Sequence, residues 1–153
     1  MGQVDERLKS LGIELPQVPD PIANYVGAVR TGNLVFLSGR GPRSEGKFVS
    51  FGKLGQDVTV EQGYQAARLT ALNLIASLKS EVGDLDKVRR IVKLLGMVNS
   101  APDFGEQPQV INGASDLLVE IFGDKGKHAR AAFGVAALPM NTSVEIEMIV
   151  EVE

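Results

Sequence analysis

The sequence predicts an α+β fold in which two helices pack on one side of a β-sheet. The last segment, Val144–Val152, alternates apolar and mostly acidic residues, which is the period of a half-buried strand. Two central segments carry apolar residues at helical spacing, and two strand-like runs near the N-terminus flank a short turn. This order of hairpin, helix, strand, helix and two strands suits helices that cover one face of a sheet.

The first forty residues predict a short helix, a connector and a hairpin. Asp5–Leu11 is a candidate helix that ends at Gly12. Leu15–Pro21 carries three prolines, which favour an extended connector. Tyr25–Arg30 and Leu34–Ser38 have the composition of strands, and the Thr-Gly-Asn sequence between them is a good hairpin turn.

The middle of the chain predicts a loop followed by a capped helix. Gly39–Gly55 is rich in glycine and is expected to be a loop with a short strand near Phe48. Thr59 and Gln62 match a capping box, in which each side chain bonds the backbone amide of the other residue. The helix is expected to run to about Ser80, with apolar residues at helical spacing: Tyr64, Ala67, Ala71, Leu74, Ile75 and Leu78.

The second half predicts a strand, a second helix and two further strands. Val88–Val98 is a strand candidate, and Gln107–Phe122 has the apolar spacing of a helix. Gly123 stands where a left-handed residue commonly ends a helix. The last two strands are expected to form one unit that pairs Arg130, at the start of a mostly apolar run, with Glu145.

Two strands are apolar at consecutive positions, so both of their faces favour burial. These runs are Leu34–Leu37 and Leu94–Leu95. Two helices cover only one face of a sheet, and the other face would then expose a large apolar patch. We therefore expect a homo-oligomer in which another subunit covers this face. The alternative is that the loop Gly39–Gly55 folds over it.

Composition limits the classes of function. The 153 residues fit a single domain, residues 1–153, with residues 1–23 as an N-terminal extension. A net charge of −3 makes nucleic acid an unlikely main partner. The chain has no cysteine and one histidine, His128, which excludes thiolate chemistry and a multi-histidine metal site in one chain. Without a secretory signal or an apolar run of about 20 residues, we expect a cytoplasmic protein with no membrane partner.

Arg130 is the residue that most clearly suggests a binding site. A guanidinium stays charged at all ordinary pH values, and burying it without an anion is very costly. Its partner is either a protein carboxylate or the carboxylate of a substrate. In the first case Arg130 forms a structural ion pair with Glu145 or a subunit contact, and Glu145 is otherwise one of the exposed residues of an alternating strand.

Several segments, taken in order, resemble one family. Asn24–Arg40 resembles the N-terminal hairpin of the Rid family, also called YjgF or L-PSP proteins. Ala129–Pro139 followed by Val144–Glu147 resembles the signature of this family near its C-terminus. The likeness covers the chain from Asn24 to the end. Asn99–Phe104 and Ile111–Ser115 resemble a longer subgroup of the family.

This resemblance implies a fold, an assembly and a reaction. The fold would be chorismate-mutase-like, with a mixed β-sheet and two main helices on one face. The assembly would be a homotrimer that binds small carboxylate ligands in clefts between subunits. Family members hydrolyse reactive enamines and imines, such as 2-aminoacrylate and 2-iminopropionate, to 2-keto acids and ammonia, without a metal or organic cofactor. The chain would then be a hydrolase of the 2-iminobutanoate/2-iminopropanoate deaminase type.

The resemblance also implies which residues form the site. The arginine that binds the substrate carboxylate falls on Arg130, and the carboxylate near the reacting centre falls on Glu145. Further substrate-binding positions fall on Tyr25, Ser38, Gly39 and Asn112. Simpler roles remain open, since Tyr25 has the character of a core or interface aromatic and Asn112 that of a helix cap.

The chain departs from the family pattern at three places. Ala132 replaces an often reactive cysteine, Arg40 stands where glutamine is common, and the connection Asn99–Gln109 is longer. The first change removes thiol chemistry, and the others affect the size and charge of the cleft.

Three functions are compatible with these residues. The first is a deaminase of reactive enamines and imines. The second is a non-catalytic trimer that binds small carboxylates or has a regulatory role. The third is an endoribonuclease or translation inhibitor of the L-PSP type. The acidic net charge and the single histidine disfavour the third, because acid–base cleavage of RNA needs two titratable groups and cations for the phosphates.

Overall fold

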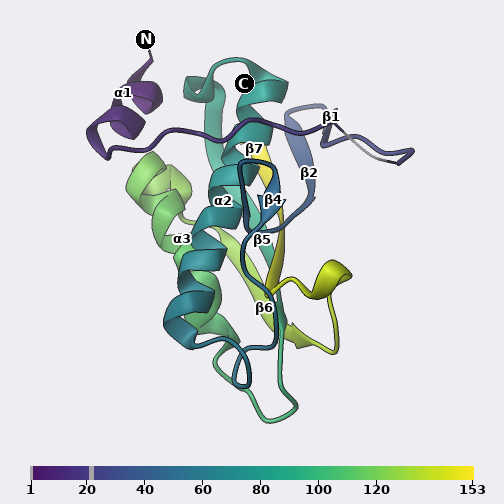
Figure 1. Ribbon diagram of the computed structural model, residues 1–153. Coiled ribbons are helices and arrows are strands. Elements are labelled where there is room, and N and C mark those ends of the chain that lie inside the picture. The colour runs from purple at the N-terminus through teal and green to yellow at the C-terminus, as the bar shows by residue number, and fades with distance from the viewer. Residues whose placement is uncertain (1, 21–22) are drawn as a thin grey trace.

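A five-stranded mixed sheet carries two long helices on one face (Figure 1). The computed structural model describes residues 2–20 and 23–153. The strands lie in the order β1-β2-β7-β5-β6. The helices are α1 (Gln3–Ser10), α2 (Val60–Val82) and α3 (Gln107–Phe122), with short 3-10 turns η1 (Leu85–Lys87), η2 (Gly123–Gly126) and η3 (Pro139–Asn141). The strands are β1 (Ala28–Thr31), β2 (Leu34–Arg40), β3 (Arg43–Ser44), β4 (Lys47–Phe48), β5 (Val88–Asn99), β6 (Ala129–Val135) and β7 (Val144–Val152).

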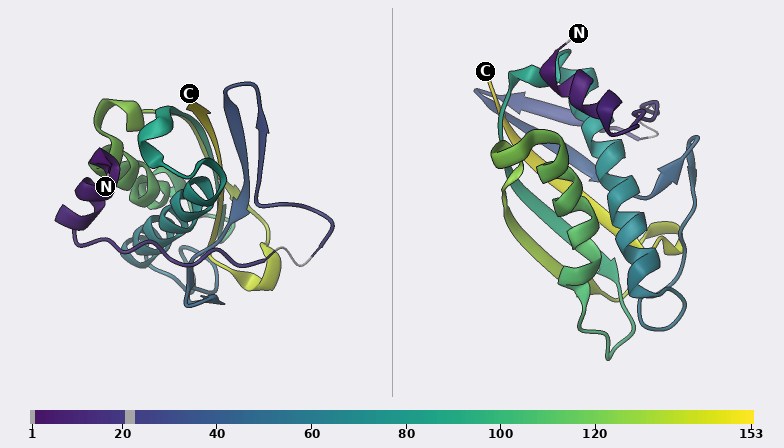
Figure 2. Two further views of the ribbon diagram at one scale, coloured as in Figure 1. Left: turned by 90° about the horizontal axis from the view of Figure 1, so that it is seen from above. Right: turned by 90° about the vertical axis from the view of Figure 1, so that its left-hand side faces the viewer.

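The α+β fold with two helices on one face of the sheet is confirmed. Figure 2, right, shows α2 and α3 side by side in front of the strands. The parallel pair β5–β6 makes the sheet mixed, since the other pairs are antiparallel. The buried core lies between this face and the helices, and includes Leu74, Ile75, Leu94, Leu117, Ile146 and Met148.

Local sequence signals account for the bounds of both long helices. The capping box is present, because Gln62 N donates to Thr59 Oγ1 at 3.2 Å and Thr59 N donates to Gln62 Oε1 at 3.0 Å. The helix α2 continues to Val82, slightly beyond the predicted end, and stops at Gly83, which has a φ of 82°. The helix α3 has the predicted bounds, and Gly123 follows it with a φ of 62°.

The N-terminal hairpin is confirmed with a shorter first strand. Its two strands pair from Thr31↔Leu34 to Ala28↔Leu37, and Gly32 supplies the left-handed turn residue with a φ of 57°. The segment Tyr25–Gly27, predicted as part of β1, leaves the regular ladder. Its backbone instead bonds Ser38, which lies beside the bulge in β2. The end of the predicted connector, at Pro21, lies outside the described residues.

The predicted two-strand unit of Arg130 and Glu145 is wrong. The strand β7 lies between β2 and β5, and β5 separates it from β6. It pairs antiparallel with both of these strands, and its inward-facing residues are buried under the helices. Arg130 aligns with Leu94, and Glu145 aligns with Met97, so the two residues are not cross-strand partners.

The face of the sheet away from the helices exposes apolar side chains. Val29, Phe36 and Phe133 are 55%, 42% and 41% exposed there, and Leu95 and Ile149 are half-buried. We call this surface the open face. The loop Gly39–Gly55, which could instead have covered this face, lies on the helix side of the sheet. Asn73 of α2 donates to the carbonyl of Arg43 at 3.0 Å, so β3 in this loop packs beside α2. The idea that this loop covers the open face is therefore wrong.

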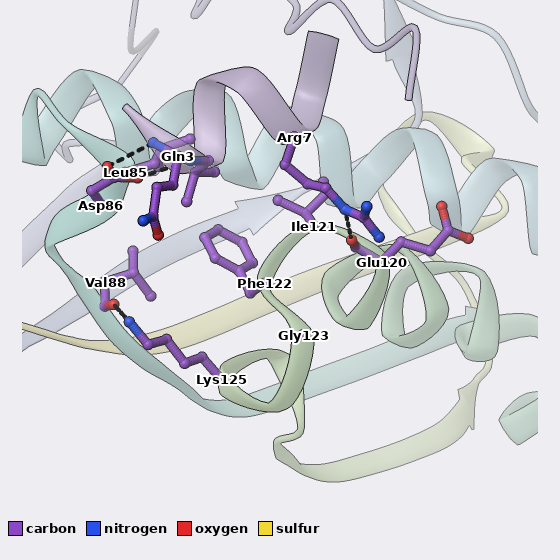
Figure 3. Close-up of a pocket in the computed structure, with 11 residues that line it drawn as sticks. Gln3, Arg7, Leu85, Asp86, Val88, Glu120, Ile121, Phe122, Gly123 and Lys125 are labelled. Atoms are coloured by element: carbon purple, nitrogen blue, oxygen red, sulfur yellow. Dashed lines mark hydrogen bonds between the residues drawn. The ribbon is translucent and has the colours of Figure 1, made fainter. Parts of the chain in front are cut away.

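The short helix α1 is fastened to the end of the domain. Asp86 in η1 accepts hydrogen bonds from Gln3 N and Val4 N, both at 2.8 Å. These two bonds hold the pKa of the Asp86 carboxyl below its ordinary value. A cavity of about 410 Å³ lies between α1, η1 and the end of α3 (Figure 3). Within the described residues, no helix is both long and apolar enough to cross a bilayer.

Candidate functional site

Arg130 lies on the edge strand β6 and points toward α3. Its register partner Leu94 is buried beneath the helices, which places the Arg130 side chain on the helix side of the sheet. Its Nη1 donates to Asn112 Oδ1 at 2.8 Å and to Ser115 Oγ at 3.1 Å. Both acceptors are neutral, so the charge of Arg130 is held in place without being compensated.

The contacts of Arg130 leave one edge of the guanidinium free. The two protons of Nη1 are used by Asn112 and Ser115. Among residues 2–20 and 23–153, no acceptor bonds Nε or Nη2, and no carboxylate forms an ion pair with Arg130. The free Nε–Nη2 edge has the fork geometry that binds a carboxylate through two parallel hydrogen bonds. The alternative of an ion pair between Arg130 and Glu145 in the same chain is wrong.

The alternative that Asn112 caps this helix is wrong. Asn112 lies more than a full turn inside α3, which begins at Gln107. The cap position is Glu106, whose side chain makes no capping bond. The Asn112 side chain instead accepts the shorter of the two Arg130 bonds.

Ser115 and His128 join this cluster, and neither is among the predicted site residues. His128 Nδ1 lies 2.6 Å from the carbonyl oxygen of Gly126, and its Nε2 lies 2.9 Å from Ser115 Oγ. Burial lowers the pKa of His128, and the Arg130 charge lowers it further against the opposing effect of the Gly126 bond. The available signal was helical spacing, because Asn112 and Ser115 are three residues apart and share one face of α3.

Glu145 lies on the opposite side of the sheet from Arg130. Its neighbours Val144 and Ile146 are fully buried in the core, so the half-buried Glu145 side chain points to the open face. Burial raises the pKa of the Glu145 carboxyl, and the nearby charge of Glu147 raises it further. A raised pKa makes the carboxylate a stronger base, which favours proton transfer from a bound water.

Gly39 and Ser38 lie beside Glu145, at the bulge of β2. A Cβ atom on Gly39 would stand 3.2 Å from Glu145 Oε2, so the glycine keeps the carboxyl uncovered. The Ser38 hydroxyl donates to the carbonyl of Val26 at 2.6 Å, and its backbone amide donates to Gly27 at 2.9 Å. These bonds hold the segment before β1 against β2, close to the Glu145 carboxyl.

Tyr25 and Arg40 lie near this end of the hairpin. Tyr25 is 56% exposed and belongs to the segment before β1, so it is not a core aromatic of the single chain. Burial lowers the pKa of Arg40, and the nearby Tyr25 opposes this effect. The Arg40 side chain rests against Gly27, and its Nε is buried without a partner among the described residues.

Ala132, at the position of the often reactive cysteine, shares the helix side of β6 with Arg130. It is half-buried and packs against the core, two residues beyond the arginine. Its methyl group offers no reactive atom at this position. The polar groups beside Arg130 are therefore hydroxyl, amide and imidazole groups.

The site residues form two separate groups in one chain. The arginine half-site comprises Asn112, Ser115, His128 and Arg130, on the helix side of the sheet edge. The glutamate half-site comprises Ser38, Gly39 and Glu145, with Tyr25 and Arg40 nearby, at the end of β2. The structure brings the members of each group together and keeps the groups on opposite sides of the sheet.

The cavities of the chain have different relations to these groups. One of about 330 Å³ lies on the open face and is lined by Phe36, Ser38, Leu95 and Glu147, next to the glutamate half-site. The cavity drawn in Figure 3 lies at the C-terminal end of α3, between this end, α1 and η1. It contains none of the predicted site residues, and its position follows from how α1 docks.

Comparison with known proteins places this arrangement in a family. Residues 5–152 match the profile of the family described as "YjgF/chorismate_mutase-like, putative endoribonuclease". The chain is 44% identical to protein TCP17 of Trypanosoma cruzi, over 98% of this chain and 94% of that protein. It is 32% identical to a 2-iminobutanoate/2-iminopropanoate deaminase of Dermatophagoides farinae, over 92% of this chain and 95% of that protein.

A solved structure has the same fold. It is the protein Atu1372 of Agrobacterium tumefaciens, whose function is unknown. The TM-score is 0.92 and the identity 48%, with 98% of this chain and 92% of that chain covered.

Proposed function

The chain belongs to the YjgF/chorismate-mutase-like family, and on that premise we propose that it hydrolyses reactive enamines and imines of small carboxylic acids to 2-keto acids and ammonia. The substrate class comprises compounds such as 2-aminoacrylate and 2-iminopropionate. A relative that is 32% identical is named for this reaction, which supports the proposal at the level of the family.

The observation that carries the proposal is the free edge of Arg130. Asn112 and Ser115 hold Nη1 and leave Nε and Nη2 available to a ligand. A substrate whose carboxylate binds this edge is fixed in orientation as well as position. The imine carbon of the substrate then lies at a defined place beside the arginine half-site. Small 2-imino acids have their carboxylate directly attached to the reacting carbon, so one contact orients the whole substrate.

Glu145 supplies the proton transfer in this proposal. An enamine first moves a proton from its nitrogen to its terminal carbon and becomes the imine. Glu145 takes a proton from the water that attacks the imine carbon and passes it to the nitrogen. It then moves the hydroxyl proton of this adduct to the nitrogen, so that ammonia leaves and the carbonyl group forms. The raised pKa of its carboxyl suits both steps. General acid–base assistance of this kind accelerates a reaction by roughly 10²–10⁴-fold, which is adequate for substrates that already hydrolyse spontaneously.

The two half-sites require a second subunit in order to meet. Arg130 and Glu145 lie on opposite sides of the sheet, so one chain cannot present both to one small substrate. The apolar open face, next to Glu145, is a surface that a neighbouring subunit can cover. We therefore place the reaction in a cleft of a homotrimer, with Arg130 from one subunit and Glu145 from its neighbour.

The proposal is tested by measuring 2-keto acid release from 2-aminoacrylate that a second enzyme generates in the assay. Wild-type protein should accelerate the release, and Arg130→Ala should lose the effect, because its substrates lose a bidentate charged contact. Losing two charge-assisted bonds lowers kcat/KM by about 10²-fold or more. Arg89→Ala, at an exposed arginine on β5, is the matched control and should act as wild type. A wild-type rate equal to spontaneous hydrolysis would refute the proposal.

A second function, carboxylate binding without catalysis, is favoured because the arginine half-site forms without Glu145. Its hydrogen bonds are formed without Glu145, so it can bind a carboxylate in a protein that performs no chemistry. Such a protein would be a small-carboxylate-binding or regulatory trimer. Thermal-shift measurements with 2-keto acids separate the two functions, because ligand stabilisation without accelerated hydrolysis would identify the binding protein.

A further inference from the structure

The geometry points to a directed hydrogen-bond relay from Gly126 through His128 and Ser115 to Arg130, which positions the guanidinium and couples carboxylate binding to proton uptake by His128. Ser115 and His128 are positioning residues in this scheme, since they act through Arg130. The inference rests on the proposed carboxylate site and adds to it a proton link and two residues outside the family assignment.

The direction of each hydrogen bond follows from the atoms involved. The Gly126 carbonyl only accepts, so His128 Nδ1 carries the proton of this 2.6 Å bond. In the neutral ring Nε2 is then an acceptor, and the Ser115 hydroxyl donates to it at 2.9 Å. The oxygen of Ser115 keeps its lone pairs for Nη1 of Arg130, at 3.1 Å. Each donor in the relay therefore has one acceptor.

The relay determines which edge of Arg130 meets the ligand. Nη1 is held by Asn112 and Ser115, two residues on the same face of a rigid helix. Two fixed acceptors on one nitrogen orient the guanidinium plane, and the Nε–Nη2 edge then points away from α3. Without the Ser115 hydroxyl, Asn112 alone remains and the plane can rotate about that bond. Orientation errors of this kind reduce binding and rate even though the charge is retained.

His128 has no anionic partner of its own in the described residues. Arg130 lies two residues further along the chain, on β6, and Lys93 of β5 is the register partner of Ala129, which directly follows His128. On η2 and the following residue, Asp124 and Lys127 are paired with each other at 3.2 Å, and Lys125 donates to the carbonyl of Val88 at 3.5 Å. On α3, Asp116 accepts the hydroxyl of Tyr64 at 2.7 Å, and Glu120 pairs with Arg68 at 3.5 Å. A protonated His128 would therefore add a second positive charge beside Arg130.

A bound carboxylate supplies the missing negative charge. It offsets the charge of Arg130, which lowers the pKa of His128 together with burial. The pKa of His128 therefore rises when the anion binds, and by reciprocity the protonated protein binds the anion more tightly. After protonation Nε2 donates to Ser115, whose oxygen then accepts bonds from both the imidazolium ring and Nη1 of Arg130.

The single histidine makes this relay directly measurable by NMR, in protein purified without a histidine tag. The imidazole nitrogen signals should report the Nδ1-protonated tautomer in the free protein. Titration between about pH 5 and pH 8 should show a higher midpoint for His128 when pyruvate, a 2-keto acid product, is present. Arg130→Ala should abolish the effect of pyruvate. An Nε2-protonated ring, or a midpoint that excess pyruvate leaves unchanged, would overturn the inference.

Binding measurements give a second, independent readout. Wild type should bind pyruvate at least about fivefold more tightly near pH 5 than near pH 8, which is the low end of coupling between linked sites. Glu145 also titrates, so the relay accounts only for the difference in the pH dependence of pyruvate affinity between wild type and His128→Gln. The affinity of His128→Gln should depend less on pH. Ser115→Thr retains a hydroxyl and should keep the wild-type profile, while Ser115→Ala should lose it.

The outcomes separate this inference from the proposed deaminase activity. A pH profile that is identical in wild type and His128→Gln, with Arg130-dependent turnover intact, overturns the relay alone. Proton-linked pyruvate binding without accelerated hydrolysis supports the relay and contradicts the deaminase. Circular dichroism of each variant verifies that the fold is retained, and Ser115→Thr provides a conservative change if Ser115→Ala does not fold.

Discussion

Arg130 is a half-buried cation whose protein partners are both neutral. The sequence indicates that a charge at this place needs an anion, but not which atoms surround it. The structure supplies Asn112 and Ser115, and it leaves two guanidinium nitrogens for a ligand. His128 is bonded at both ring nitrogens. Such contacts depend on which helix packs against β6, and the local pattern carries no information about this.

Glu145 is the residue whose removal should separate binding from chemistry. Glu145→Gln retains the size of the side chain and removes the proton acceptor, so kcat should fall about 10²–10⁴-fold with little change in KM. Because the carboxylate is the active base, the wild-type rate should decrease as the pH falls through the raised pKa of Glu145. Steady-state kinetics over pH, with the variant lacking this acidic limb, checks the prediction.

Glu147→Gln is the control for this experiment. Glu147 lies on the same face, and its charge raises the pKa of Glu145. Removing it should leave turnover in place and move the acidic limb to lower pH. Equal losses of kcat in both variants would contradict a specific role for Glu145.

At the scale of elements, local sequence patterns predict where helices and strands lie in the chain. They do not predict which strands lie next to each other in the sheet. The bounds of α3 follow from its apolar period and the glycine after it. The start of β1 is later than predicted, since Tyr25–Gly27 bonds the bulge region of β2 instead of extending the ladder. The pairing of β6 with β7 was wrong because strand order depends on long-range packing. Alternation shows that β7 is half-buried, but not which strands flank it.

The crossing of α2 and α3 depends on Gly113. A Cβ atom there would lie 1.9 Å from the Tyr64 carbonyl oxygen, a backbone atom that cannot move without shifting a helix. Gly113→Ala should therefore lower the free energy of unfolding by about 1–3 kcal/mol or more, as overpacking does. Asn112 and Ser115 flank this position, so carboxylate affinity should fall as well. Urea unfolding and pyruvate binding measure the two effects.

Gly105→Ala is the matched control for this prediction. A Cβ atom at Gly105 meets no atom within 4 Å. Its unfolding free energy should stay within about 1 kcal/mol of wild type, because the substitution only restricts the unfolded chain. Equal stability of both variants would contradict the close contact between α2 and α3.

At the scale of the whole molecule, the open face is the main feature that a single chain leaves unexplained. Val29, Phe36 and Phe133 are exposed together beside a cavity of about 330 Å³. Consecutive apolar residues in two strands, Leu34–Leu37 and Leu94–Leu95, predict this surface from the sequence. The sequence did not predict that the two half-sites would lie on opposite sides of the same sheet.

Phe36→Glu should dissociate the assembly. Burying a phenylalanine at an interface contributes about 1.5–3 kcal/mol per subunit, and a carboxylate there would be buried without a partner. Light scattering should give a trimer mass for wild type and a monomer mass for the variant. Val119→Glu, at an exposed position on α3, is the control and should remain trimeric. A trimeric Phe36→Glu protein would place the interface elsewhere.

Mixed trimers test whether the site is shared between subunits. Arg130→Ala and Glu145→Gln should each be inactive alone, because each lacks one half-site. When equal amounts are assembled together, a cleft with both intact residues forms at about one quarter of the interfaces, from random pairing in a ring. Activity should recover to about this fraction of wild type. No recovery would show that both residues act within one subunit.

The sequence by itself determined the elements, the apolar faces and the need of Arg130 for an anion, because periodicity, capping and the cost of burying charge are local properties. Only the tertiary structure decided the strand order, the relay through His128 and Ser115, and the separation of Arg130 from Glu145. All three features depend on how distant segments of the chain pack together. Successive residues of a strand point to opposite faces of the sheet, so the strand register decides which face a side chain reaches.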